Sequence, residues 1–344
     1  MFASRSVLIA VPIEATFASP LQLAFRKLGF NTYLFDYRNV FGNFSFNPIF
    51  TFMLIPVAIL KISLHHFPDK FSVLNELLYI TCVFWKPTYL FAVKGEHITK
   101  TTIMRIKKLG IFTIVWQVDP SLDPRIWSFV DKHQRAYDVY ISCEPGTVIT
   151  ELKRRGFKQV LYMLGAADSE QMHQSHEKEK YDITLVGTYH PERERFLQAL
   201  EGLDVHIWGW GDWHNSDVAN MFEGGSLTNK NMLEVYKQSK IVVNIGRAIG
   251  STIPTNLRPF EAAQVGAFIL VDYKPNLKKV FVLGKEIDTF KTPKELREKV
   301  DFYLKNPDKR SKIAQALFKR VKKEHTYQKR LQTLFQQIEF LKSH

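Results

Sequence analysis

Apolar, strand-like stretches alternate with amphipathic, helix-like stretches along most of the chain. In the first half, the strand-like stretches are residues 6–12, 31–37, 88–94, 111–119, 138–144 and 158–164. They are rich in β-branched and aromatic residues and lack a strict apolar–polar alternation, which is typical of parallel strands covered on both faces. Helix-like stretches lie between them, and Gly29, Gly110 and Gly156 favour helix ends because glycine tolerates a positive φ. The first half therefore predicts an α/β domain built on a parallel sheet.

The same pattern begins again after a polar stretch, DSEQMHQSHEKEK, at residues 168–180. Strand-like stretches follow at 181–187, 205–210, 240–246, 267–273 and 285–290. One helix start is clearly marked, because TPKE at 292–295 has the spacing of a capping box with proline at the first helical position. A chain of 344 residues is long for one core and suits two domains. We expect an N-terminal domain at 1–167, a linker at 168–180 and a C-terminal domain at 181–327.

The segment NPIFTFMLIPVAILKISLHHF, residues 47–67, does not fit this alternation. It is apolar nearly all round, yet it is too short and too often interrupted by proline to span a bilayer, which needs about 20 apolar residues. Two interpretations stay open for it. It is either a helix packed on the first sheet, or a surface hairpin that makes peripheral contact with a membrane or a lipid-like acceptor. No other stretch predicts a spanning helix.

Composition and charge narrow the classes of protein and of partner. Hydrophobic residues make up 45% of the chain and charged residues 24%, which is typical of a globular protein. Cys82 and Cys143 cannot build a disulfide framework, and no cysteine–histidine cluster has zinc-ligand spacing. We therefore expect a reducing, cytoplasmic compartment and no bound metal. The net charge of +13 favours phosphate-bearing partners or an anionic membrane surface, although a solvated helix face is the simpler explanation of the basic run KRSKIAQALFKRVKKEH.

The loops that follow the strands of the second half are small and polar. Ligands of open α/β sheets bind beyond the carboxyl ends of the strands, and glycine there lets backbone N–H groups approach a phosphate. The loops contain Gly187 and Thr188, then Gly209, Trp210 and Gly211, then the stretch from Asn244 to Arg247. A turn requirement explains each glycine singly, and neither a dinucleotide fingerprint nor a Walker A sequence is present. Together the loops predict a nucleotide or phosphate site.

A charged pair stands at the start of the expected helix at 258–266, in NLRPFEAAQVGAFILVDY. Arg258 can offer a bidentate fork to a diphosphate. Glu261, three residues later on the same helical face, can accept two hydrogen bonds from a ribose diol. The alternative is that Arg258 and Glu261 pair with each other as a structural bridge.

The tryptophans of WGWGDW and the late residues His325 and Tyr327 also have structural explanations. Trp208 alternates within a strand and is expected in the core, whereas Trp210 and Trp213 lie in the following loop, where stacking on a ligand stays open. His325 and Tyr327 come late in the chain and are expected to pack or to form a hinge.

The segments NLRPFEAAQVGAFILVD, LGKEIDTFKTPKELREKVDFYLKNPDKRSKIAQ and HTYQKR together resemble the C-terminal domain of CgeB-like, spore-maturation type glycosyltransferases of the GT-B superfamily. The resemblance covers residues 181–330, and VWQVDP and VLYMLGAAD extend it loosely into the first half. It implies two Rossmann-like domains facing each other across a cleft, with the C-terminal helix, 328–344, returning to the N-terminal domain.

By that resemblance, the chain would transfer a sugar from a nucleotide-diphosphate-sugar donor without a metal ion. Glu261 would hold the donor ribose, and Arg258 and Arg247 would neutralise the diphosphate. Ile253 stands where retaining relatives often carry a second glutamate, which leaves the stereochemistry open. The acceptor is expected to be a glycan, protein or polymer hydroxyl, and an anionic or lipid-linked acceptor would suit the positive charge.

An inverting transfer would need a general base in the first domain. Asp119 is the main candidate because it follows the strand at 111–119. Its alternative role is to cap the helix that begins near Asp123 and Pro124. Glu14, after the first strand, is the second candidate, and Glu96 with His97 comes third.

Two other functions stay open. A nucleotide-sugar epimerase would use the same fold and donor without an acceptor, so products formed from the donor alone would reveal it. A non-catalytic basic protein that binds nucleotide-sugars or nucleic acid would show strongly salt-dependent affinity without turnover.

Overall fold

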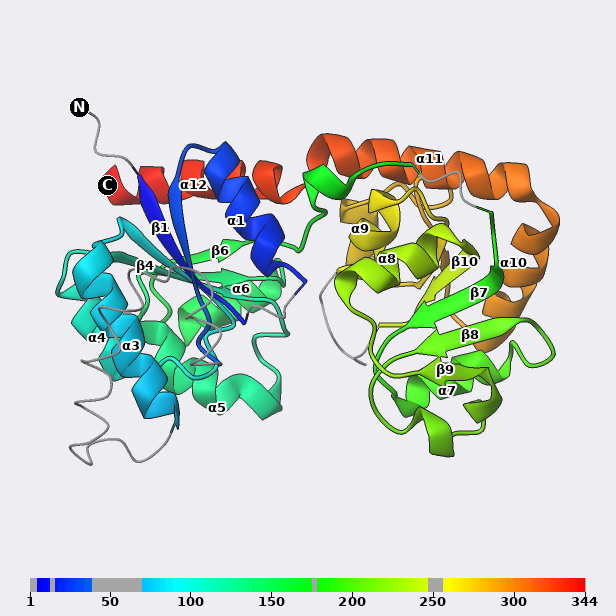
Figure 1. Ribbon diagram of the computed structural model, residues 1–344, viewed down its shortest axis with the longest axis horizontal. Helices are drawn as coiled ribbons and strands as arrows, with labels where there is room; N and C mark the ends of the chain where they lie inside the picture. The colour runs from blue at the N-terminus through cyan, green and yellow to red at the C-terminus, as the bar shows by residue number, and fades with distance from the viewer. Residues whose placement is uncertain (1–4, 13–15, 39–69, 175–177, 247–255, 344) are drawn as a thin grey trace. The chain divides into compact units, whose positions relative to one another are not determined.

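The computed structural model describes residues 5–12, 16–38, 70–174, 178–246 and 256–343. The chain divides into two compact units, unit 1 with residues 1–164 and 330–344, and unit 2 with residues 165–329 (Figure 1). Each unit holds a sheet of six parallel strands. Every strand-like stretch predicted from the sequence contains a strand, so the α/β class is confirmed.

In unit 1 the strands lie in the order β2-β1-β3-β4-β5-β6. Their bounds are β1 Ser6–Ala10, β2 Asn31–Phe35, β3 Tyr89–Val93, β4 Phe112–Gln117, β5 Val139–Ser142 and β6 Val160–Tyr162. Because β2 and β3 pair with opposite edges of β1, the connections turn in opposite directions beside it. This topological switch point is where open α/β sheets bind ligands.

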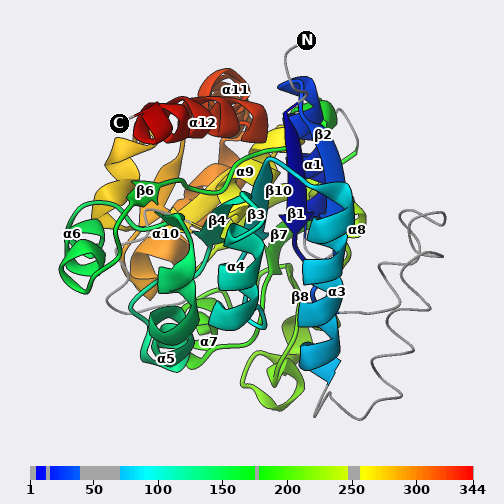
Figure 2. The same cartoon turned by 90° about the vertical axis from the view of Figure 1, so that its left-hand side faces the viewer.

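Helices cover both faces of the first sheet. On one face are α3 Lys70–Trp85, α4 Lys100–Lys107, α5 Pro124–His133 and α6 Thr147–Arg154, and their apolar residues join one buried cluster with the strands. Figure 2 shows α3 and α4 side by side. On the other face, α1 Ala18–Lys27 meets α12 Tyr327–Ser343 through an edge-on contact of Phe25 with Phe335. The prediction that the C-terminal helix returns to the first domain is thus confirmed.

In unit 2 the order is β12-β11-β10-β7-β8-β9. Their bounds are β7 Tyr181–Val186, β8 Val205–Trp208, β9 Phe222–Gly224, β10 Ser239–Asn244, β11 Ile269–Asp272 and β12 Asp288–Phe290. The sequence did not predict β9, because three residues carry no recognisable periodicity. The switch point here lies between β7 and β10.

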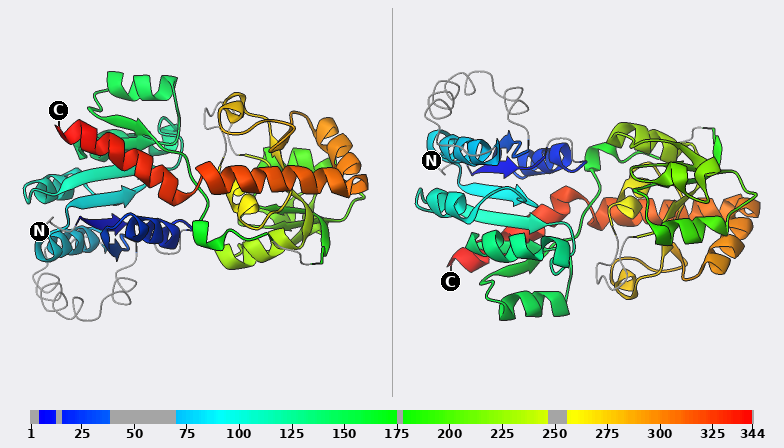
Figure 3. Two further views of the ribbon diagram at one scale, coloured as in Figure 1. Left: turned by 90° about the horizontal axis from the view of Figure 1, so that it is seen from above. Right: turned by 90° about the horizontal axis from the view of Figure 1, so that it is seen from below.

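The helices of unit 2 are α7 Pro191–Gln198, α8 Asn229–Lys237, α9 Arg258–Gln264, α10 Pro293–Lys305 and α11 Pro307–Glu324. Helices α7 and α10 share a buried cluster on one face of the sheet, and α11 packs against both α10 and α9 (Figure 3). The predicted start of α10 is confirmed, because the Thr292 side chain accepts a hydrogen bond from the Glu295 backbone N–H. The Glu295 carboxylate accepts from the N–H of Lys291, one residue before the cap.

The polar stretch 168–180 is bound to unit 2 in its described parts. The backbone N–H groups of Asp168 and His173 donate to the side chain and the backbone carbonyl of Gln264 at 2.7 and 2.9 Å. Glu179 pairs with Arg310 of α11 at 3.0 Å. Polarity in this stretch therefore reflects hydrogen bonds to α9 and α11.

Some predictions fall outside the described residues. These are the interpretations of segment 47–67, of Glu14, of Arg247 and of Ile253. Among the helices that are described, none combines the length and the apolar character that a membrane span requires.

Candidate functional site

Arg258 lies at the carboxyl end of β7, on the switch point of the second sheet. Its Nε donates to the backbone oxygen of Val186, the last residue of β7, at 3.2 Å. Its Nη1 contacts the sulfur of Met232 at 2.9 Å and donates to the carboxylate of Glu261. The guanidinium is therefore fixed by a strand, a helix and its own helix, as the position of a ligand-binding cation would require.

The start of α9 is tied to the end of β10 by two asparagines. The side-chain oxygen of Asn256 accepts from the backbone N–H of Arg258 at 3.1 Å, and its Nδ2 donates to the side-chain oxygen of Asn244 at 2.9 Å. Asn244 is buried. This predicted site residue thus reaches the site through Asn256, and it fixes where α9 begins.

The Arg258–Glu261 pair is the bridge that the sequence left open as an alternative. The Glu261 side chain is only 6% exposed, and that of Arg258 is 26% exposed. Burial alone would lower the pKa of Arg258, but the charge of Glu261 together with the nearby Tyr236 raises it above its ordinary value. Burial, followed by the charge of Glu261, raises the pKa of Tyr327. The pair is therefore shielded, and Arg258 is its more accessible member.

Arg193 is a site residue that the sequence analysis missed. From α7, its Nε donates to the backbone oxygen of Ile245 at 2.7 Å, and its Nη1 donates to that of Thr188. It thereby joins the loops that follow β10 and β7. A Cβ atom at Gly187 would lie 2.5 Å from Nη1 of Arg193, so the glycine makes room for the guanidinium. The available signal was a basic residue in the first turn of the helix after the Gly187 loop.

Gly187 and Gly209 serve close packing, which corrects the expectation that their backbone N–H groups are open to a phosphate. The N–H of Gly187 donates to the oxygen of Trp208 at 2.8 Å, and that of Gly209 donates to Gly224 at 3.1 Å. A Cβ at Gly209 would overlap the backbone oxygen of Gly187. Gly211 has φ +93°, which favours glycine. Parallel pairing thus continues beyond the strand ends, and its hydrogen bonds occupy the backbone N–H groups of Gly187 and Gly209.

The three tryptophans of WGWGDW differ in their surroundings. Trp213 is fully buried, and its Nε1 donates to the oxygen of Gly187 at 3.0 Å, so it supports the loop, and of the two alternatives left open for it the structure excludes stacking on a ligand. Trp210 is 67% exposed and accessible to a ligand. Trp208 is half-buried and meets the ring of Tyr181 edge-on, so it is less buried than expected.

The sequence analysis also missed an ion pair at the carboxyl end of β11, between Asp272 and Lys274. The carboxylate of Asp272 accepts from the N–H of Gly246 at 2.9 Å and pairs with Lys274 at 3.0 Å. Asp272 therefore brings another cation to the carboxyl edge that carries Arg258.

His325 is buried in contact with the rings of Phe260 and Phe281, so the predicted packing role is confirmed.

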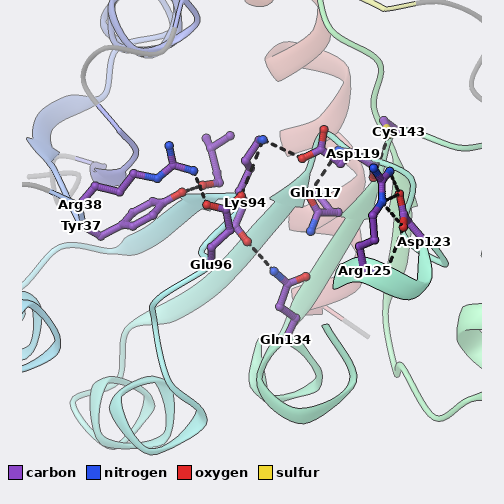
Figure 4. A network of polar contacts seen from close by, with 11 residues as sticks. Tyr37, Arg38, Lys94, Glu96, Gln117, Asp119, Asp123, Arg125, Gln134 and Cys143 are labelled. Carbon is purple, nitrogen blue, oxygen red and sulfur yellow. Dashed lines mark hydrogen bonds and ion pairs between the residues drawn. The ribbon is translucent and has the colours of Figure 1, made fainter. Parts of the chain in front are cut away.

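In unit 1, Asp119 lies just beyond β4, and its carboxylate is 2.7 Å from the ammonium of Lys94 (Figure 4). Its side chain is 44% exposed. The alternative role predicted for it is wrong, because the N-cap of α5 is Asp123, which accepts from the N–H of Arg125 at 3.0 Å. Asp119 is therefore an accessible carboxylate at a strand end.

The third-ranked candidates for a base lie beyond β3. Glu96 pairs with Arg38 and lies 3.7 Å from the ammonium of Lys94. The ring of His97 stacks on Phe71 at 3.7 Å, and its backbone oxygen accepts from Asn75. Of these two, Glu96 shares an ion-pair network with Asp119.

We compared the chain with known protein families and with solved structures. Residues 192–336 match the glycosyl transferase-like family. Sucrose-phosphate synthase from Thermosynechococcus elongatus is 9% identical, with 98% of this chain and 100% of that chain covered and a TM-score of 0.61. Anabaena Alr3699/HepE, solved in complex with UDP-glucose, is 11% identical, with 98% and 100% covered and a TM-score of 0.61. The β-glucosyltransferase of T4 phage is 12% identical, with 96% and 98% covered and a TM-score of 0.60.

No curated protein is similar enough to match the chain. The likeness to solved structures spans both units and confirms the predicted fold. The chain has a GT-B fold, and its residues 192–336, which include Arg193, Arg258 and Glu261, match the glycosyl transferase-like family.

Proposed function

We propose that the protein is a glycosyltransferase that moves a sugar from a nucleotide-diphosphate-sugar to an acceptor hydroxyl. The observation that carries this proposal is the fixed position of Arg258, which Val186 and Glu261 hold at the switch point of a Rossmann-like sheet. The GT-B fold supports the reaction class. The UDP-glucose bound to Anabaena HepE supports the class of donor.

In the proposed donor site, cations bind the diphosphate, and a carboxylate accepts hydrogen bonds from the ribose. Val186, Met232 and Glu261 engage Nε and Nη1 of Arg258, and we assign Nη2 to the diphosphate. Arg193, Lys274 and Arg247 would add positive charge, with Thr188 nearby. Glu261 would accept hydrogen bonds from the ribose, and Trp210 would stack on the donor. Guanidinium groups can carry the charge of the leaving diphosphate, so the proposal needs no metal ion.

In the proposed reaction, Asp119 removes the proton of the acceptor hydroxyl. The acceptor oxygen forms a bond to the anomeric carbon of the sugar, and the bond from that carbon to the diphosphate oxygen breaks. The electron pair leaves with the nucleoside diphosphate, whose charge Arg258 offsets. Proton removal needs an accessible carboxylate, which Asp119 supplies, and the leaving diphosphate needs a positive charge, which Arg258 supplies.

A thermal-shift panel of UDP-, GDP-, dTDP- and CMP-sugars tests the donor site. A ligand that binds only the folded protein stabilises it by about 2.7 kcal/mol at one hundred times its Kd. We expect one nucleotide class to raise the melting temperature, and Glu261→Ala to abolish the shift. Glu234→Ala is the matched control, because Glu234 also forms an i, i+3 pair, with Lys237, but on α8. A shift that survives Glu261→Ala would remove the role assigned to this carboxylate.

Product analysis separates transfer from the other functions. With the donor and a mixture of acceptor glycans, we expect nucleoside diphosphate and a glycosylated product. An epimerised nucleotide-sugar formed from the donor alone would identify an epimerase. Salt-dependent nucleic-acid binding with no donor turnover would identify a binding protein.

A further inference from the structure

The backbone of Lys94 adopts a conformation that lysine rarely takes. Its φ is +61°, and only one other non-glycine residue among those described, Lys86 with φ +45°, is also positive. For an L-residue this region costs roughly 1 to 2 kcal/mol. Such conformations persist where the surroundings impose them, and they gather at functional sites.

Several contacts hold Lys94 in this conformation. Its N–H donates to the oxygen of Trp116 at 2.8 Å, and its own carbonyl accepts from the side-chain amide of Gln134. The next N–H, of Gly95, donates back to Val93 at 2.8 Å. The other amide atom of Gln134, its Oε1, is buried without a hydrogen-bond partner in the described part of the chain. An unpaired buried oxygen costs about 1 to 3 kcal/mol of stability. This cost adds to that of the strained Lys94 backbone, which Gln134 contacts.

This conformation directs the Lys94 side chain across the sheet edge, from β3 towards β4. Its ammonium lies 2.7 Å from Asp119 and 3.7 Å from Glu96, and Glu96 also pairs with Arg38 (Figure 4). Charges of alternating sign thus run over the carboxyl ends of β2, β3 and β4. Lys94 is the most shielded of the four, with 23% of its side chain exposed against 44% for Asp119.

We propose that Lys94 is a positioning residue that holds the carboxylate of Asp119 in place for proton transfer, an inference that rests on the proposed function. An exposed aspartate can otherwise occupy several rotamers. The imposed backbone of Lys94 selects one of them and leaves the carboxylate open to solution on its other side. Stability does not account for this arrangement, because an ion pair whose carboxylate is 44% exposed contributes only about 0 to 1 kcal/mol, less than the strained backbone costs.

Three substitutions separate the charge of Lys94 from its backbone. Lys94→Met removes the ammonium and keeps the strain, Lys94→Gly removes both, and Lys94→Arg keeps a cation. Lys86→Gly is the matched control, because it relieves the other positive φ at an exposed lysine far along the chain from Asp119. The assay is release of UDP from UDP-glucose with water as acceptor, or from the panel sugar that gives the thermal shift.

We expect kcat to fall about ten- to a hundred-fold in Lys94→Met and Lys94→Gly, which is the usual cost of a misplaced catalytic group. The donor KM should stay within about two-fold of wild type, because donor binding is assigned to other residues. Lys94→Gly should melt no lower than wild type, because it relieves strain. Lys94→Arg should recover part of kcat, and Lys86→Gly should keep all of it.

The outcomes distinguish this inference from the function on which it rests. If wild type releases no nucleoside diphosphate from any donor, the proposed function fails. If wild type turns over and Lys94→Met and Lys94→Gly match its kcat, Lys94 has no positioning role and the proposed function stands. A joint loss of melting temperature, donor affinity and kcat in both variants would show a structural role and would equally overturn the inference.

Discussion

The carboxyl edges of the two sheets carry charge in different ways. In unit 2 the two arginines are anchored to backbone oxygens: Arg258 donates to that of Val186, besides its pair with Glu261, and Arg193 donates to that of Ile245. In unit 1 the charged groups are held by one another, and the side chains of Asp119 and Arg38 are 44% and 45% exposed. Backbone-held cations suit a ligand of fixed charge such as a diphosphate, whereas an exposed, balanced network suits proton transfer.

The two sheets also differ in strand order. In unit 2 the first strand, β7, has β8 and β9 on one side and β10 on the other, the arrangement of dinucleotide-binding sheets. In unit 1 a single described strand, β2, lies beyond β1. In both units the first strand, β1 or β7, borders the switch point. The residues that directly follow this strand therefore lie at the carboxyl edge of the sheet, where a ligand would bind. Substitutions at this edge should therefore cost stability and binding in unit 2 and mainly turnover in unit 1.

The largest effect is expected at the two loop tryptophans of unit 2. Trp213→Ala should lower the free energy of unfolding by about 3 to 5 kcal/mol, because a buried indole is replaced by a cavity. Trp210→Ala should change it by less than about 0.5 kcal/mol, because that ring is exposed. Urea unfolding followed by circular dichroism measures both. Equal losses in the two variants would contradict the distinction between support and ligand contact.

Gly187→Ala should cost about 1 to 3 kcal/mol of stability and weaken donor binding, because the added methyl displaces the Arg193 guanidinium. Gly225→Ala is the control, because a Cβ there meets nothing within 4 Å. A cycle with Arg193→Met sharpens the test. If Gly187 acts through Arg193, the double variant should lose about 0.5 to 3 kcal/mol less than the sum of the single losses. Strict additivity would separate the two residues.

Arg258→Lys should weaken donor binding about ten- to a hundred-fold, because a single ammonium cannot keep the contacts with Val186 and Glu261 and also donate to the diphosphate as Nη2 would. Calorimetric titration with the donor from the thermal-shift panel measures the Kd. Arg195→Lys is the matched control, because Arg195 forms an exposed i, i+3 pair with Glu192. Unchanged affinity in Arg258→Lys would mean that a point charge suffices.

The smallest stability effects are expected in unit 1. Asp123→Ala should cost about 1 kcal/mol by removing the cap of α5, and turnover should persist. Asp119→Ala should cost less than about 1 kcal/mol, because its pair with Lys94 is exposed, and turnover should be lost. Thermal melting and an assay of nucleoside diphosphate release check the two. A larger stability loss from Asp119→Ala would return this residue to a structural role.

Much of the fold was predictable because periodicity is a local property. Strand-like stretches bounded by glycine located the strands, and the spacing of TPKE located the start of α10. Arg258 and Glu261 were found for the same reason, since three residues apart at a helix start means the same face. Arg193 was missed because its partners, Thr188 and Ile245, meet only when β7 and β10 lie side by side.

The sequence by itself determined that this chain has two parallel α/β units, and which loops follow the strands. It also determined that a cation and a carboxylate share the first turn of α9. Only the tertiary structure decided that Gly187 makes room for Arg193, that Asp123 and not Asp119 caps α5, and that Lys94 reaches Asp119. Helix and strand patterns follow from neighbours a few residues apart, whereas these contacts join residues that only sheet pairing brings together.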